Sequence, residues 1–405
     1  MHTLPLTLGA SRPLPEEDRR GSGLPSMGHR AARRAPSARS LAFVVLAFCF
    51  PALAQWSAVW SPGYQAAVLR YRTGAPDAAV SEVCAWPASR LRDEVNVLAA
   101  LREKARRPDD PGALTRWQEV PVRAALMLHT DCSLTARGNG TACEPHETAA
   151  AEIAGMLRDD EVNRDFARRW YGVMAGLAGG GNRWRDALGW VEKGLRDFPG
   201  AAELLVTVGA IEEVHALQTS CSEPPPAQER LADSDVRRIR SEMLQRLEVQ
   251  GYLEKARDAL VAAIAANPSL CEAHLRLGRV AWRLGDAREA RSELDRVLAG
   301  KSRPSEAFLA HLFLGRLDED AGRLDEAARS YKAALALEVN SQSARLALSH
   351  LRLRRGDATT ARAEAERALR PGGARLRPDP FWLYPWGPSV GVEDRLNALR
   401  REARS

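Results

Sequence analysis

Small residues recur at regular intervals in an otherwise amphipathic pattern over residues 251–370. The glycines at Gly251, Gly285, Gly322 and Gly356 are spaced by 34, 37 and 34 residues, and each is followed five positions later by an alanine. The second half of each of the last three units has paired apolar positions four residues apart, the spacing of one helix face: Leu294 and Leu298, Tyr331 and Leu335, Ala365 and Leu369. A repeat of about 34 residues with small residues at constant offsets predicts stacked pairs of helices.

The chemistry of these positions explains why a helix pair would need them. A helix commonly ends at glycine because the next backbone position is left-handed, and glycine adopts that conformation at little cost. Asp286 and Asp357 directly follow two of the glycines, where a carboxylate can cap the free amides of the next helix. Gly278, Gly315 and Ser349 come seven residues before the last three glycines. We expect them to lie where the two helices cross, at an axial separation of about 8 to 10 Å.

Two segments carry a family resemblance: LRLGRVAWRLGDAREARSELDRVL and LFLGRLDEDAGRLDEAARSYKAAL resemble tetratricopeptide (TPR) repeats. Clear repeats cover about residues 168–370, and degenerate ones extend back to about residue 60. The resemblance implies an all-α fold, a right-handed superhelical solenoid of antiparallel helix pairs. It also implies that the first helices line a concave groove that binds a protein or peptide partner, and it implies no chemistry of the repeats themselves.

The groove positions that the resemblance implies lie on the first helices of the clear repeats. They are Leu275, Arg279, Trp282, Arg283, Leu312, Arg316, Glu319, Leu346, His350 and Arg354. Arg279, Arg316 and His350 fall on one face, one per repeat, and could receive an acidic segment through charge-assisted hydrogen bonds. The alternative is that all ten positions form an ordinary solvated surface. Leucines stand where the carboxylate-clamp members of the family carry lysine, so recognition of a chaperone-type C-terminus is not expected.

The same patterns predict six regions along the chain. They are an N-terminal extension and signal peptide (1–54), degenerate helical hairpins with a cysteine-bounded loop (55–150), TPR-like helices (151–215), a proline-rich loop (216–235), a TPR array (236–370) and a C-terminal cap (371–405). The loop is predicted from the run TSCSEPPPAQERLADSD, whose prolines interrupt the helical pattern.

The first region has the three parts of a secretory signal peptide. Four arginines between residues 30 and 39 precede the apolar run LAFVVLAFCFPALA, which ends in an A-x-A motif at Ala54. We therefore expect export to the periplasm or beyond, with cleavage near Ala54. An uncleaved anchor is the alternative, but a span needs about 20 apolar residues and this run is shorter. Whether translation starts at Met1 or Met27 stays open, and no transmembrane span is expected in the mature chain.

Most of the net positive charge of the chain lies in this first region. Of the formal charge of +6, seven arginines and three acidic residues before Ala54 contribute +4. A remainder of about +2 argues against a nucleic-acid partner, because clustered cationic residues supply most of that affinity.

One stretch, HTDCSLTARGNGTACEPH, groups residues that could do chemistry: His129, Asp131, Cys132, Cys143 and His146. Two histidines and two cysteines could bind zinc, and an exported metal-dependent hydrolase is the third function that we considered. The spacing lacks paired C-x-x-C motifs, so a Cys132–Cys143 disulfide is the preferred prediction for an exported chain. Enzyme signatures such as G-x-S-x-G, the P-loop and H-E-x-x-H are missing from the sequence, and we expect neither enzymatic activity nor a cofactor. The pairing of Cys84, Cys221 and Cys271 stays open.

The C-terminal stretch PDPFWLYPWG concentrates aromatic residues between prolines, and VEDRLNALRREARS follows it with one apolar stripe. Phe381, Trp382, Tyr384 and Trp386 are predicted to cap the exposed end of the last repeat, because an unpaired terminal helix pair needs cover. The alternative is a docking surface for peptide or sugar.

The predicted function is therefore a non-enzymatic interaction scaffold or adaptor of the periplasm or cell envelope. A module that binds envelope polysaccharide or peptidoglycan through Trp56, Trp60, Trp382 and Trp386 is the alternative from another class.

Overall fold

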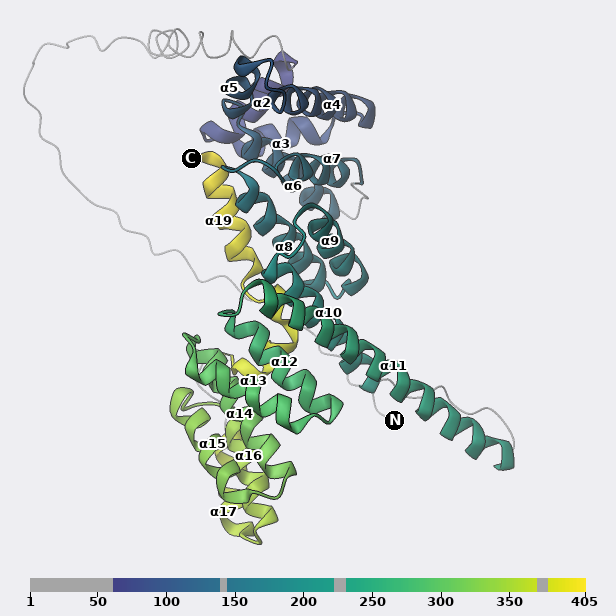
Figure 1. Cartoon of the computed structure of the whole chain (residues 1–405), viewed down its shortest axis with the longest axis vertical. Coiled ribbons are helices and arrows are strands. Elements are labelled where there is room, and N and C mark those ends of the chain that lie inside the picture. Colours follow the sequence, from purple (N-terminus) through teal and green to yellow (C-terminus); the bar gives the residue numbers. More distant parts are fainter. Residues whose placement is uncertain (1–60, 139–143, 222–230, 370–377) are drawn as a thin grey trace, which may run out of the picture. The chain divides into compact units, whose positions relative to one another are not determined.

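A computed structural model describes residues 61–138, 144–221, 231–369 and 378–405, with the backbone alone for Pro111 and residues 231–239. All the regular structure in these ranges is helical, as predicted (Figure 1). Residues Gln55–Ser405 form one unit by their contacts. The predicted signal peptide, Trp56, Trp60 and Cys143 lie outside the described residues. None of the described helices combines the length and the apolar composition that a membrane span requires.

The helices follow one another as antiparallel pairs, in which each first helix packs against the next helix of the chain. The pairs are α2 (Pro62–Thr73) with α3 (Pro76–Cys84), α4 (Ala88–Ala105) with α5 (Pro111–Gln118), α6 (Val122–Gly138) with α7 (Glu144–Met156), α8 (Arg164–Gly180) with α9 (Trp184–Asp197), α10 (Ala202–Cys221) with α11 (Leu231–Ala266), α12 (Cys271–Leu284) with α13 (Ala287–Ala299), α14 (Pro304–Asp320) with α15 (Leu324–Leu337), and α16 (Gln342–Arg354) with α17 (Ala358–Leu369). The C-terminal segment then forms α18 (Pro380–Leu383), the 3₁₀-helix η1 (Tyr384–Ser389) and α19 (Val392–Arg404).

The bends of the last three pairs are equivalent, as the sequence predicts. Gly285, Gly322 and Gly356 have φ angles of +89°, +75° and +82°, all in the left-handed region that favours glycine. The Asp286 carboxylate then accepts a hydrogen bond of 2.9 Å from the amide of Glu289, and so caps α13.

The small residues on the first helices lie where the predicted crossings occur. A Cβ added to Gly278 would lie 2.8 Å from Cγ of Leu294, and one added to Gly315 would overlap the ring of Tyr331. Glycine at these positions therefore allows the two helices of each pair, α12 with α13 and α14 with α15, to approach this closely.

The prediction for Gly251 is wrong. It lies inside α11, a continuous helix of 36 residues, instead of at a bend. Buried Leu253, Ala256 and Leu260 pack the helix against α10, where a Cβ on Gly209 would lie 2.6 Å from Leu260. Val249 and Leu253 pack against the α10 cluster on either side of Gly251, and this packing keeps the helix continuous through it.

Several predicted region boundaries also fall inside helices. The boundary at 150/151 lies in α7, the one at 215/216 in α10 and the one at 235/236 in α11. The interruption between α10 and α11 is shorter than the predicted loop of 216–235, because α10 continues to Cys221 and α11 begins at Leu231. Proline stops a helix only near its own position, so the helices extend close to the proline run from both sides.

The predicted cap is wrong for the last helix, which does not close the end of the stack, although the start of the segment does contact α16: the Asp379 carboxylate accepts a hydrogen bond of 2.8 Å from the amide of Ser343. α18 packs on α14, η1 packs on α8 and α10, and α19 packs on α2, α6 and α8, and Figure 1 shows α19, in yellow, beside α6 and α8. All of these partners are first helices of pairs. Leu353 of α16 and Leu369 of α17 stay 59% and 66% exposed, so the C-terminal segment does not bury them.

Candidate partner-binding groove

Three consecutive first helices, α12, α14 and α16, line a pocket of about 430 Å³, called here the groove pocket. Seven of the ten predicted groove residues line it: Arg279, Trp282, Leu312, Arg316, Glu319, Leu346 and His350. Leu275 lines a neighbouring pocket of about 380 Å³. Arg354 contacts Glu319 of the groove pocket, with Nη1 lying 2.9 Å from the backbone oxygen of Glu319. Arg283 points elsewhere, with Nη2 lying 3.2 Å from Oγ of Ser220.

Most of the exposed lining of the groove pocket is apolar. Leu312 and Phe313 are buried in its floor, Leu346 and Ala347 are half-buried, and Trp382 is 52% exposed. Phe381 packs edge-on against Phe313, with the ring centroids 6.5 Å apart. Two aromatic residues of the C-terminal segment therefore complete a pocket that the repeats begin.

The polar centre of the groove pocket is Glu319, which is only 1% exposed. Its carboxylate accepts a hydrogen bond of 2.8 Å from the hydroxyl of Tyr331, and its Oε1 lies 2.6 Å from Nδ1 of His350. Burial opposes ionisation, but the Tyr331 hydrogen bond and the charges of His350, Arg354 and Arg316 hold the pKa of Glu319 below its usual value. The floor of the groove pocket therefore holds an ionised carboxylate that is paired with neighbouring cationic side chains.

The three cationic side chains that were predicted to receive an acidic segment already have carboxylate partners. Nη1 of Arg279 lies 2.6 Å from Oε1 of Glu213, Nε of Arg316 lies 3.2 Å from Oδ1 of Asp320, and His350 is paired with Glu319. A carboxylate from a partner would have to compete with these internal ones. The geometry therefore argues against an acidic segment as the ligand.

Sequence reasoning missed Glu213 of α10, the residue that fastens the C-terminal segment to the groove. Glu213 is 2% exposed, accepts a hydrogen bond of 2.9 Å from the hydroxyl of Tyr384, and pairs with Arg276 and Arg279. Both guanidinium groups also stack over the Tyr384 ring, each 4.7 Å from its centroid. The one local signal was the pair Glu212–Glu213 in the mostly apolar stretch of residues 204–216.

The geometry of the last three pairs settles the architecture of this part of the chain. First helices that end at left-handed glycines cross their second helices at small residues, and the next pair packs on the last. The array has a TPR-like fold.

No protein-family model matches the chain, and no curated protein matches its sequence. Among solved structures, MamA from Desulfovibrio magneticus RS-1 (residues 41 to the end) is similar over 50% of this chain and 97% of that one, with 16% identity and a TM-score of 0.36. YrrB, described as a TPR protein with an unusual peptide-binding site, is similar over 49% and 83%, with 17% identity and a TM-score of 0.33. PilF of Pseudomonas aeruginosa is similar over 60% and 89%, with 15% identity and a TM-score of 0.40.

The C-terminal segment packs closely against glycines of α8. A Cβ on Gly176 would overlap the backbone oxygen of Pro388 and lie 2.9 Å from Cγ2 of Val392. A Cβ on Gly179 would lie 2.9 Å from Oγ of Ser389. The glycine-rich stretch GLAGGGN, residues 176–182, therefore allows the C-terminal segment to approach the backbone of α8 closely.

α19 is held on α6 and α8 by apolar and ionic contacts. Leu396 and Leu399 are each 1% exposed. Nη2 of Arg400 lies 2.7 Å from Oδ1 of Asp131, and Glu402 accepts from Arg123 at 2.9 Å and from Arg169 at 2.7 Å. The C-terminal segment is therefore an integral part of the fold along the first helices.

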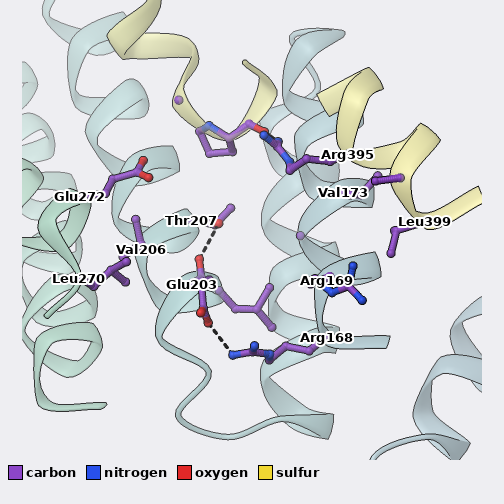
Figure 2. A pocket seen from close by; sticks show the side chains of 15 residues that line it. Arg168, Arg169, Val173, Glu203, Val206, Thr207, Leu270, Glu272, Arg395 and Leu399 are labelled. Atoms are coloured by element: carbon purple, nitrogen blue, oxygen red, sulfur yellow. Dashed lines mark hydrogen bonds and ion pairs between the residues drawn. The ribbon is translucent and has the colours of Figure 1, made fainter. Parts of the chain in front are cut away.

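A second pocket of about 410 Å³ lies between α8, α10, the start of α12 and the C-terminal segment (Figure 2). Its arginines are already bonded: Nη1 of Arg168 lies 2.7 Å from Oε2 of Glu203, and Arg395 donates to the backbone oxygen of Val390 at 2.7 Å. Figure 2 also shows the 2.8 Å hydrogen bond from the Thr207 hydroxyl to the backbone oxygen of Glu203. Of these contacts, the Arg168–Glu203 pair joins α8 to α10, and the other two are local to one segment.

The two histidines of the stretch considered as a zinc or hydrolase site bond to each other. Nδ1 of His129 lies 3.0 Å from Nδ1 of His146, and Nε2 of His129 lies 2.9 Å from the hydroxyl of Tyr64. Burial, with a smaller contribution from His146, lowers the pKa of His129 to about 3, so this ring stays neutral. Across the part of the chain that the structure describes, no group of three or more His, Cys, Asp or Glu side chains could hold a metal.

The predicted Cys132–Cys143 disulfide involves a residue outside the described ranges and stays a prediction. The described residues contain no disulfide, and Cys143 lies outside them. Sγ of Cys132 lies 3.4 Å from the backbone oxygen of Val80 on α3.

Proposed function

We propose that the protein is a non-enzymatic interaction scaffold that binds a segment of a partner protein in the groove pocket. The observation that carries the proposal is a pocket of about 430 Å³ formed by the same face of three consecutive first helices, with a mostly apolar exposed lining. Pockets of this size and character commonly bury large apolar side chains.

The chemistry of the groove pocket favours a segment with a large apolar or aromatic anchor. Leu346, Ala347 and Trp382 expose apolar surface at its mouth, while the charges of Glu319, Arg316 and Arg279 are already paired with one another or with Glu213. Phe381 shows how an aromatic ring can pack in this groove, against Phe313. Burial of one such side chain would contribute roughly 1.5 to 3 kcal/mol.

A charge placed in the groove pocket tests this proposal. Leu346→Glu would put a carboxylate at the mouth of the pocket, and Leu353→Glu is the matched control, on the same helix α16 but 59% exposed and outside the pocket. The labelled full chain and both variants would be applied to an array of ten-residue peptides of random sequence. We expect the wild type and Leu353→Glu to select peptides with a large apolar residue, and Leu346→Glu to lose at least tenfold in affinity. Equal binding by all three proteins would exclude the groove pocket.

We also propose that the scaffold acts in the periplasm or cell envelope, after cleavage near Ala54. The support is the basic, apolar and A-x-A pattern of residues 30–54. N-terminal sequencing of the protein from its native cells tests it, and an intact residue 1 or 27 would contradict it.

Polysaccharide or peptidoglycan binding stays the second candidate, because Trp382 and Trp386 are 52% and 44% exposed. Trp386 lies outside the groove pocket, 6.1 Å from the ring of Trp184. Trp386→Ala should weaken retention on insoluble peptidoglycan if sugars bind here, and should leave peptide binding unchanged. Wild-type protein that does not sediment with peptidoglycan would dismiss this candidate.

A further inference from the structure

Two cysteines meet between the first and third helix pairs of the described chain. Cys84 is the last residue of α3 and is half-buried, and Cys132 lies on α6 with no exposed surface. α3 packs against α6, and both side chains belong to the same hydrophobic core. They are far apart in sequence and adjacent only in the fold.

The backbone carbonyl of Val80 on α3 is a common reference point for the sulfurs of Cys84 and Cys132. Sγ of Cys132 lies 3.4 Å from the backbone oxygen of Val80. In a helix, the side chain four residues later lies beside that carbonyl, as the Thr130 hydroxyl does at 2.8 Å from the oxygen of Leu126. Cys84 follows Val80 by four residues, so its thiol is placed near the same carbonyl as the Cys132 thiol. Burial raises the pKa of Cys84, and a side-chain hydrogen bond with Cys132 opposes that rise in part.

We propose that Cys84 and Cys132 form a disulfide that joins α3 to α6 when the protein meets a disulfide oxidant. The Cys84 thiolate attacks the disulfide of the oxidant and forms a mixed disulfide, releasing one oxidant thiolate. The Cys132 thiolate then attacks the Cys84 sulfur and displaces the second oxidant thiolate. Each cysteine loses one proton, and the two electrons reduce the oxidant to its dithiol form.

The burial of the two thiols sets their order of reaction. Cys84 is the accessible thiol and so meets the oxidant first, whereas buried Cys132 resolves the mixed disulfide from inside the core. Burial also raises the pKa of Cys84, so oxidation without a catalyst should be slow at neutral pH. A bond here would tie the first helix pair to the third and restrict the unfolded chain between residues 84 and 132.

Peptide mapping of the full chain tests the proposal, because trypsin separates the three cysteines concerned. Cleavage after arginine places Cys84 in peptide 73–90, Cys132 in peptide 124–137 and Cys143 in peptide 138–158. The protein would be incubated with oxidised glutathione at about pH 8.5, near the usual thiol pKa, then alkylated, digested and analysed by mass spectrometry. We expect peptides 73–90 and 124–137 to appear as one cross-linked species that reduction separates.

Exposed Cys221 is the internal control, since its conversion to a glutathione adduct shows that the oxidant was effective. A link from either peptide to 138–158, or full alkylation of Cys84 and Cys132 once Cys221 has reacted, would overturn the proposal. The melting temperature gives a second readout. It should rise by several degrees on oxidation of the wild type and of Cys271→Ser, and should not rise in Cys84→Ser.

Discussion

At the scale of single residues, two glycines that fit the repeat pattern differ in what they contribute to the structure. Gly315 allows α14 and α15 to cross, since a side chain there would overlap Tyr331. Gly251 was predicted to mark a bend, yet it lies within α11, and a Cβ added to it would meet nothing within 4 Å.

Alanine substitution should separate these two roles. Gly315→Ala should destabilise the protein by about 1 to 3 kcal/mol, because the helix pair must open to admit a methyl group. Gly251→Ala should stabilise it by about 0.5 to 1 kcal/mol, because glycine costs helical stability and no contact opposes the change. Denaturant unfolding followed by circular dichroism measures both, and a destabilised Gly251→Ala variant would contradict the continuous helix.

Glu213 is the residue on which the contact between the C-terminal segment and the array depends most. It is the buried carboxylate shared by Arg276, Arg279 and the Tyr384 hydroxyl. Glu213→Gln keeps the shape but leaves Arg279 without its carboxylate, and we expect a loss of about 3 kcal/mol. Glu254→Gln, at an exposed position of α11, should change stability by less than about 0.5 kcal/mol. Similar melting temperatures for the two variants would show that Glu213 is dispensable.

At the scale of elements, the repeat could be predicted because its signals are local. Gly285 and Asp286 determine a bend and a cap within a few residues, and Gly278 with Leu294 determines a crossing within one helix pair. The continuity of α11 could not be read in the same way. Glycine occurs both inside helices and just after their ends, so the residue type alone does not show which applies. Packing of α11 against α10 determines that the helix continues through Gly251.

The candidate site was predictable to a similar extent. The seven predicted residues in the groove pocket share one helical face, which the period of the repeat already determines. Phe381 and Trp382 were predicted to cover the exposed end of the last repeat, whereas they lie in the groove pocket between α14 and α16. No local signal tells which face of the helices a C-terminal segment will contact.

At the scale of the whole molecule, the C-terminal segment joins helix pairs that are distant in sequence. α19 contacts α2, α6 and α8, and buries Val392, Leu396 and Leu399 there. The C-terminal part of the chain therefore helps to stabilise the N-terminal part of the array.

Removal of α19 should have a local effect for this reason. In a chain ending at Gly391, amides of α2, α6 and α8 should lose protection against hydrogen exchange, whereas those of α15 to α17 should keep theirs. Repeat arrays are stabilised mainly by neighbouring contacts, so the loss should stay near its origin. Exchange measured by mass spectrometry gives the result for each helix, and faster exchange in α17 would support the cap that we predicted from the sequence.

The sequence by itself determined the class of fold, the period of the TPR-like array, its left-handed bends and the face that lines the groove pocket. These features depend on residues that interact within one or two helices. Only the tertiary structure decided that α11 runs through Gly251, that Tyr384 meets Glu213 from 171 residues away, and that Cys132 of α6 packs against the Val80 carbonyl of α3. Such pairings depend on complementary burial and charge between segments that are distant in sequence. The spacing of residues along the chain does not show which distant segments will meet.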